Sequence, residues 1–159
     1  MTYWKSFKSK SCSLELCAPT KEEVLEEIVD LLVASNSLPT SLRASALSAL
    51  LERERMGSTG VGTNVAIPHV KLKGLETAAC SLAVHARGVE WAAIDGAPVH
   101  IVFTVLRPDR PTDKHDPEKH LGMMQWIARL SRDADFRRFA QRVTKKAELI
   151  ELLEEKSGV

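Results

Sequence analysis

The stretch RERMGSTGVGTNVAIPH, residues 53–69, joins three different local patterns. It opens at the polar end of a helical pattern, passes through Gly57, Gly60 and Gly62, and closes on a short apolar run that Pro68 ends. So many glycines are unsuited to a helix interior. The pattern therefore predicts a loop or short strand pair, then a short strand at 65–67 with His69 just beyond it.

Two helices are expected before this stretch. Thr20 followed by Glu23 has the spacing of a capping box. Apolar residues then recur at helical intervals while acidic residues fill the other face, as on a helix that lies on a core. These apolar residues are Val24, Leu25, Ile28, Leu31 and Leu32. A break at Leu38–Pro39 precedes the second helix, expected at about 40–54.

Two longer strands are expected after it. Residues 80–86 and 99–106 are rich in apolar side chains, and the second run is apolar at both parities, which is typical of a strand covered on both faces. Asp95–Gly96 between them is a turn signal.

Three further helices complete the pattern. Asp116–Pro117 offers a cap and a first-turn proline to one of them, and shorter ones are expected around 136–139 and after Thr144. Helices before, between and after strands predict an α/β (α+β) fold, in which a single mixed sheet of about five strands is flanked by helices on both faces.

Composition places the chain among ordinary globular proteins. Its 159 residues, 44% hydrophobic and 27% charged, suit a single domain, expected at 12–157 after a flexible basic tail at 1–11. A net charge of +1 gives no field for holding a nucleic acid. Apolar runs such as 101–106 fall far short of the ~20 residues of a membrane helix, so no direct membrane insertion is expected.

The cysteines are three, an odd number, with no C-x-x-C pair among Cys12, Cys17 and Cys80. They suit a reducing cytoplasm and carry no assigned function; each is expected to be a small buried hydrophobe.

The glycine-rich segment 57–62 allows close approach of backbone amides to an anion, with the hydroxyls of Ser58 and Thr59 as further donors. It lacks the Lys-Ser/Thr of a phosphate-binding P-loop and does not open a helix. Taken alone, the glycines favour a tight turn between two elements over an anion site. Arg53 before them either ends a helix in solvent or clamps a phosphoryl oxygen.

His69 is a candidate nucleophile. A neutral imidazole keeps one lone pair, which attacks phosphorus without a separate base. Lys71 lies two residues on, on the same side of the chain if it stays extended. The alternative is a hydrogen-bonded surface histidine.

The positions of the other histidines in the sequence argue against a metal site. His115 and His120 are five residues apart, which is not the i,i+4 spacing that places two imidazoles around zinc. His85 and His100 lie inside strand patterns and are expected to be sheet residues. No metal or other cofactor is expected.

The order of these motifs resembles a known family. Residues 53–62 and Val65-Ala66-Ile67-Pro68-His69 are similar to the signature of the enzyme IIA domains of the bacterial phosphoenolpyruvate-dependent phosphotransferase system, in the fructose/mannitol/nitrogen-regulatory class. IDGAPVHIVF at 94–103 and the segment from His120 to Leu130 are similar to its later motifs. The resemblance extends over roughly residues 12 to 155.

The resemblance implies a phosphotransferase that works through a phosphohistidine. His69 would accept a phosphoryl group from the histidine-containing phosphocarrier protein, and His120 would support it with a hydrogen bond. Arg53, with Ser58, Thr59 and Lys71, would hold the phosphoryl oxygens. The phosphoryl charge would favour the protonated form of His120 and raise its pKa.

Two departures from the family pattern stand near the nucleophile. Val70 replaces the usual small residue after Ile-Pro-His, and its β-branched side chain would narrow the approach of a partner protein. Thr63-Asn64-Val65 replaces the more familiar Asn-Gly-Val.

Several functions stay open at this point. With no sequence left over for a IIB domain or a permease, the chain is expected to act in trans, first as a stand-alone nitrogen-regulatory component that binds regulatory proteins. The alternatives are a IIA component that relays phosphate to a separate IIB protein for sugar uptake, and a degenerate binding module that is never phosphorylated. A metal-dependent hydrolase built on His69, His115, Asp116 and His120 is the least favoured. A homodimer is left open.

Overall fold

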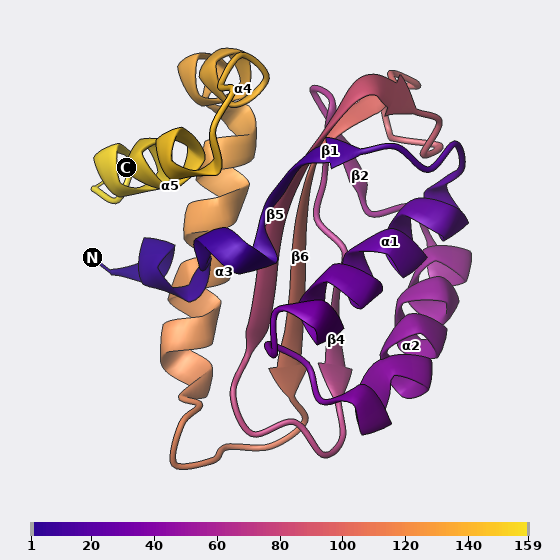
Figure 1. Ribbon diagram of the computed structural model, residues 1–159, viewed down its shortest axis with the longest axis vertical. Helices are drawn as coiled ribbons and strands as arrows, with labels where there is room; N and C mark the ends of the chain where they lie inside the picture. The colour runs from indigo at the N-terminus through magenta and orange to yellow at the C-terminus, as the bar shows by residue number, and fades with distance from the viewer. Residues whose placement is uncertain (1, 159) are drawn as a thin grey trace.

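The computed structural model describes residues 2–158, which form one mixed sheet with helices on both faces (Figure 1). Within those residues the sheet has six strands in the order β1-β5-β6-β3-β2, with β4 also paired to β6. The strands are β1 (Ser13–Leu16), β2 (Gly60–Gly62), β3 (Val65–Ala66), β4 (His69–Leu72), β5 (Ala79–Val89) and β6 (Val99–Pro108). The predicted fold class is confirmed.

Helices α1 (Lys21–Ala34) and α2 (Arg43–Met56) cover one face of the sheet (Figure 1). The Thr20 hydroxyl caps α1 by accepting from the Glu23 amide at 3.2 Å, as its sequence spacing predicts. The second predicted helix begins with a 3-10 turn at Thr40–Leu42 before α2. The apolar side chains between this helix pair and the sheet are called here the α1–α2 core; they include Val24, Leu25, Ile28, Leu72, Val102 and Leu106.

Helices α3 (Pro117–Arg132), α4 (Ala134–Ala140) and α5 (Lys146–Glu155) lie on the other face (Figure 1). The Asp116 carboxylate caps α3 by accepting from the Glu118 amide at 3.0 Å, with Pro117 in the first turn. The α3–α5 core beneath them includes Ile101, Phe103, Val105, Trp126, Ile127 and Phe136. No helix in residues 2–158 is both long and apolar enough to cross a membrane.

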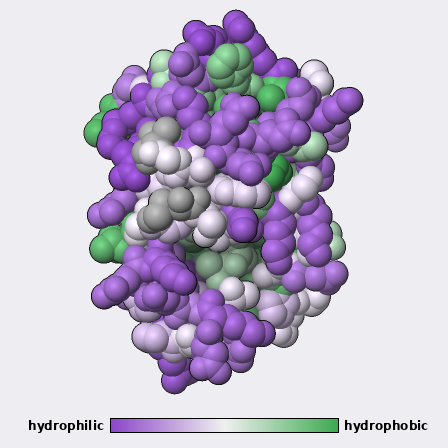
Figure 2. Space-filling view, turned by 90° about the vertical axis from the view of Figure 1, so that its left-hand side faces the viewer, coloured by the Kyte–Doolittle hydropathy of each residue, from purple (hydrophilic) through white to green (hydrophobic). Residues whose placement is uncertain are grey.

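The N-terminal segment packs against the α3–α5 core, where the sequence analysis expects a flexible tail at 1–11. Residues 3–6 and 9–11 form 3-10 helices. Phe7 is only 1% exposed, and its ring meets that of Phe103 edge-on at 5.9 Å. Met1, the first residue of the expected tail, lies outside the described residues. Figure 2 views this side of the molecule, and most of its surface is hydrophilic.

The cysteines divide between the core and the surface. Cys12 and Cys80 are buried as expected, and burial raises the pKa of the Cys12 thiol to about 11. Cys17 differs, because it is exposed and its sulfur lies 3.5 Å from the Glu27 carboxylate.

Strands β3 and β4 place the candidate nucleophile. Both pair in parallel with β6, β3 opposite 101–102 and β4 opposite 105–108. The ladder breaks at Pro68 because proline has no N–H to donate, yet its carbonyl still accepts from the Val105 amide at 3.0 Å. The chain therefore continues as a strand beyond Pro68, and His69 is the first residue of β4.

Candidate functional site

His69 is an exposed side chain whose ring is held by its own backbone turn. Its Nδ1 lies 2.9 Å from the carbonyl oxygen of Ile67. A carbonyl oxygen only accepts hydrogen bonds, so Nδ1 carries a proton and donates. In the neutral ring the lone pair is therefore on Nε2.

The strand register brings two cations to the same side of the sheet as His69. His69 lies opposite Val105 of β6, and Lys71 lies opposite Arg107. Val105 belongs to the α3–α5 core, and alternate residues of a strand share a face. His69, Lys71 and Arg107 therefore lie on the face that α3 covers.

Val70 points the other way. It is half-buried and packs on the α1–α2 core, as does Leu72 two residues on. The expectation that its branched side chain narrows the approach to His69 is therefore wrong, because strand alternation places Val70 on the opposite face.

His120 stands in the first turn of α3 and is half-buried. Burial, followed by the positive charge of Arg107 and by contributions from His115 and His69, lowers its pKa to about 4. The ring is therefore neutral at neutral pH. The pKa of His120 responds to the charges of Arg107 and His69, so the first turn of α3 lies within electrostatic range of the group on β4 and β6.

His115 joins this group from the loop before α3. Its ring centroid lies 5.5 Å from that of His120, and burial, followed by the charge of Arg107, lowers its pKa. From the sequence, His115 is predicted only as a candidate metal ligand, and Arg107 is not predicted as a site residue. The signal for Arg107 was its parity with Ile101, Phe103 and Val105 at the end of a predicted strand.

A backbone hydrogen bond holds the glycine-rich loop next to this site. The Ile67 amide donates to the Thr59 carbonyl at 3.0 Å, which sets the loop beside the strand that leads to His69. Arg53, near the end of α2, donates from Nη1 to the Gly57 carbonyl at 2.6 Å and remains half-exposed.

The two hydroxyls of the loop are engaged within the protein. Ser58 donates to the Trp91 carbonyl at 2.8 Å and accepts from the Gly60 amide at 3.0 Å. Thr59, 4% exposed, donates to the Glu54 carboxylate and accepts from Trp91 Nε1 at 3.1 Å. Neither hydroxyl proton is directed at an incoming anion; both fix the shape of the loop.

Glu54 organises this loop, a role that the sequence analysis does not assign. Its side chain is 6% exposed and pairs with the Lys21 ammonium at 3.1 Å. It also accepts from the amide and the hydroxyl of Thr59. Lys21 donates in addition to the Trp91 carbonyl at 2.9 Å, so the network joins α1, α2, the loop and the segment after β5.

The ligand set required for a metal-dependent hydrolase does not assemble. Within residues 2–158, no three or more histidine, cysteine or acidic side chains are arranged to hold a metal ion. His85 and His100 are satisfied sheet residues, as expected: His85 lies 2.9 Å from the Ala18 carbonyl, and His100 lies 2.9 Å from the His85 carbonyl.

Comparison of the sequence with known protein families gives a match over nearly the whole chain. Residues 5–156 match the family described as "Phosphoenolpyruvate-dependent sugar phosphotransferase system, EIIA 2". The nitrogen regulatory protein of Pseudomonas aeruginosa is 35% identical over 118 residues, which cover 74% of this chain and 72% of that protein. The fructose-specific EIIA component of Haloferax volcanii is 36% identical over 103 residues, which cover 65% of this chain and 66% of that protein.

Solved structures share the fold. The crystal structure of the nitrogen regulatory protein IIA-Ntr from Neisseria meningitidis superposes with a TM-score of 0.80 at 26% identity, covering 96% of this chain and 99% of that one. The enzyme IIA in a complex of IIA mannitol and phosphorylated IIB mannitol from Escherichia coli is similar in fold alone, with a TM-score of 0.72 at 17% identity over 94% of this chain and 97% of that one.

Proposed function

The chain belongs to the EIIA 2 family of the phosphoenolpyruvate-dependent sugar phosphotransferase system, and on that premise we propose that it carries a phosphoryl group on Nε2 of His69. The family implies a phosphocarrier role. The donor is the histidine-containing phosphocarrier protein, and the chain serves as a nitrogen-regulatory component that binds regulatory proteins in the cytoplasm.

The hydrogen bond from His69 Nδ1 to the Ile67 carbonyl carries this proposal. It fixes the tautomer in which Nε2 holds the lone pair, on a ring that is exposed at the surface. In an in-line transfer, the bond from phosphorus to the donor imidazole breaks as the bond to Nε2 forms, and the donor nitrogen keeps the electron pair of the broken bond. No general base is needed, because Nε2 has no proton to lose.

Stabilisation of the phosphoryl oxygens falls to the cations on the same face. Arg107 and Lys71 lie opposite each other in the register, two residues beyond the pair of Val105 and His69. His120 enters the reaction neutral, since its pKa is about 4, and donates a single hydrogen bond. The charge of a bound phosphoryl group then raises that pKa.

The glycine-rich loop contributes shape rather than hydroxyl groups. Ser58 and Thr59 donate to Trp91 and Glu54, so their part in the proposed site is to hold the backbone of the loop beside Ile67. Arg53, half-exposed at the end of α2, remains available from its free guanidinium nitrogen to contact the phosphoryl group or the donor.

A phosphorylation assay tests this assignment. The protein is incubated with phosphoenolpyruvate and the upstream phosphotransferase proteins, and intact masses are followed over time. Wild type gains one acid-labile phosphoryl group. His69→Gln gains none, and His120→Ala gains it about 100-fold more slowly, the usual effect of removing one donor to developing charge. His100→Gln, outside the site, serves as the matched control.

Two results would reject parts of the proposal. Uptake by His69→Gln at the wild-type rate removes His69 as the nucleophile. No uptake by wild type from a competent cognate donor favours the binding module that is never phosphorylated.

Sugar transport is the second candidate function. It is favoured by the 36% identity to a fructose-specific EIIA component. The phosphorylated protein, mixed with purified fructose-type and mannitol-type IIB proteins, distinguishes the two. Rapid transfer to a IIB protein supports transport, whereas a regulatory component keeps its phosphoryl group and changes its protein partners with phosphorylation state.

A further inference from the structure

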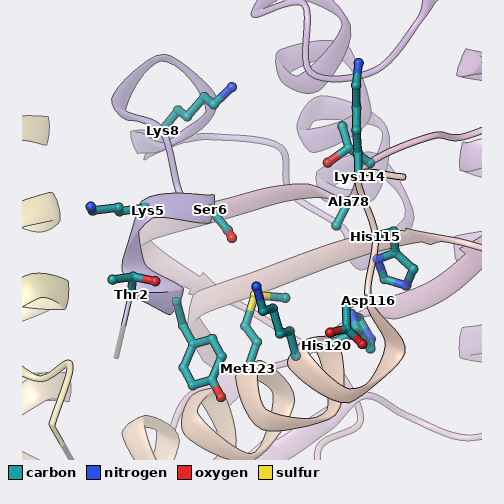
Figure 3. A pocket seen from close by; sticks show the side chains of 13 residues that line it. Thr2, Lys5, Ser6, Lys8, Ala78, Lys114, His115, Asp116, His120 and Met123 are labelled. Atoms are coloured by element: carbon teal, nitrogen blue, oxygen red, sulfur yellow. The ribbon is translucent and has the colours of Figure 1, made fainter. Parts of the chain in front are cut away.

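A cavity of about 530 Å³ lies between the N-terminal segment and the first turn of α3 (Figure 3). This volume is in the range of small-molecule sites. In Figure 3 residues 2–8 form one side, and the loop before α3 with the start of that helix forms the other. His120 lines the cavity, which therefore adjoins the proposed phosphorylation site without containing His69.

The charges around this cavity are mainly positive. Four lysines line it against one carboxylate, that of Asp116, which is already engaged with the Glu118 amide. None of the four ammonium groups forms an ion pair within the described residues. These lysines are Lys5, Lys8, Lys114 and Lys119.

His115 gives the cavity an unsatisfied polar group. The residue is 8% exposed, and its Nε2 is buried with no hydrogen-bond partner in residues 2–158. Backbone hydrogen bonds of 3.3 Å in both directions with Thr112 hold it in place. A buried polar atom left unpaired in a free protein is stabilised when a bound ligand supplies the partner.

We propose that this cavity binds a small organic phosphate. The phosphate oxygens take hydrogen bonds from lysine ammonium groups, which supply more positive charge than one carboxylate would require, and from the neutral imidazole of His115. The carbon skeleton packs on Ala78, Met123 and the ring of Tyr3, which give the same cavity an apolar wall.

The N-terminal wall depends on a glycine. A Cβ at Gly122 of α3 would collide with the hydroxyl of Tyr3, so the absence of a side chain there lets the segment lie on the helix. The Tyr3 ring also packs on Trp126, with centroids 6.0 Å apart. The cavity is therefore complete only while the N-terminal segment is docked.

One consequence rests on the proposed function. Because His120 borders the cavity and lies within electrostatic range of His69, the ligand and a phosphoryl group on His69 would both place negative charge near one imidazole. Occupancy of the cavity and phosphorylation therefore oppose each other, each weakening the other by the same factor.

Calorimetric titration of the unphosphorylated full chain tests the site, with glucose 6-phosphate and glycerol 3-phosphate as probes and glucose and glycerol as controls. We expect saturable binding with a Kd below about 1 mM for at least one phosphate, and shifts in the ring resonances of His115 and His120. Lys8→Gln combined with Lys119→Gln weakens binding by at least about tenfold. Lys10→Gln, on the same segment but outside the cavity, leaves it unchanged.

Two further variants complete the test. One tests the N-terminal side of the cavity, and the other separates this proposal from the proposed function. Gly122→Ala, with unchanged circular dichroism, weakens binding by displacing Tyr3. His69→Gln has no phosphoryl acceptor and still binds the probe. The proposal fails if neither phosphate saturates, if glucose binds as well as its phosphate, or if the double lysine variant binds as tightly as wild type. None of these results bears on whether His69 is phosphorylated.

Discussion

His69 and His120 carry the same ring in different surroundings. His69 is exposed, with Nδ1 donating to a carbonyl and the lone pair left on Nε2. His120 is half-buried and has a pKa of about 4. Burial and neighbouring cations suppress the charge on the second ring, so it acts as a neutral donor that gains charge only when an anion arrives.

Replacing Arg107 by glutamine should raise the pKa of His120. The guanidinium is the second cause of the depressed value after burial, and removing a positive neighbour favours protonation of an imidazole. An NMR titration of the His120 ring proton measures the change. Arg110→Gln, at an exposed position in the following loop, is the control. An unchanged pKa in Arg107→Gln would mean that the guanidinium does not face the ring.

Stability should fall as the pH is lowered from about 6.5 to about 4. His120 has a folded pKa below its ordinary 6.5, so in this window the unfolded chain binds more protons than the folded one, and acid favours unfolding. The lowered pKa of His115 acts in the same direction. Urea midpoints for wild type and His120→Gln measure the effect. The variant should show a shallower fall, and an equal fall would contradict the prediction.

The sequence identifies the candidate residues whose roles are marked by short motifs, and misses those that depend on the fold. His69 after Ile-Pro and His120 after a cap and a proline are recognisable in the linear chain. Arg107 becomes a candidate only once β4 is known to lie beside β6 in register. Glu54 looks like one of several exposed acids until the loop folds onto it.

At the level of elements, the end of α2 and the loop after it form one polar unit. Glu54 receives hydrogen bonds from Lys21 and Thr59, and Trp91 joins the unit by donating from Nε1 to the Thr59 hydroxyl. A buried ion pair with extra hydrogen bonds is strongly disrupted when one partner is removed, because the remaining charge stays buried.

Glu54→Gln should therefore destabilise the protein by about 3 kcal/mol, since the Lys21 ammonium, 15% exposed, loses its counter-charge. Glu52→Gln on the same helix is the matched control. Glu52 is 65% exposed and pairs with Arg55 in solvent, so its loss should change stability by less than about 0.5 kcal/mol. Urea unfolding followed by fluorescence measures both. Equal values for the two variants would show that the network does not bear on stability.

The elements found in the sequence are the long, periodic ones. Helices α1 and α3 are recognisable in the sequence from their caps and the helical spacing of their apolar residues. Strands β5 and β6 are recognisable from their apolar runs. β1 and β4, with four residues each, have too few positions for a period and exist because a neighbouring strand offers a ladder. The structure accordingly has strand residues on both sides of Pro68, where the local rule for proline predicts an end.

On the scale of the whole molecule, the sheet separates two cores, and the chain crosses between them. The N-terminal residues pack on the side of α3, α4 and α5, so that the first and last parts of the sequence share one core. His69 and the cavity lined by His115 and His120 lie on this same side. The docking of residues 3–11 is therefore tied to the surroundings of His120.

Phe7→Ala measures how firmly the N-terminal segment is docked. Its buried ring contacts Phe103, and its centroid lies 6.2 Å from that of Trp126, so truncation leaves a cavity in the α3–α5 core and should cost about 3 to 5 kcal/mol of unfolding free energy. Phe139→Ala, at a position 46% exposed on α4, should cost less than about 1 kcal/mol. Urea unfolding compares the two. A loose tail at 1–11 would give the opposite order, because a ring that spends its time in solvent contributes little on folding.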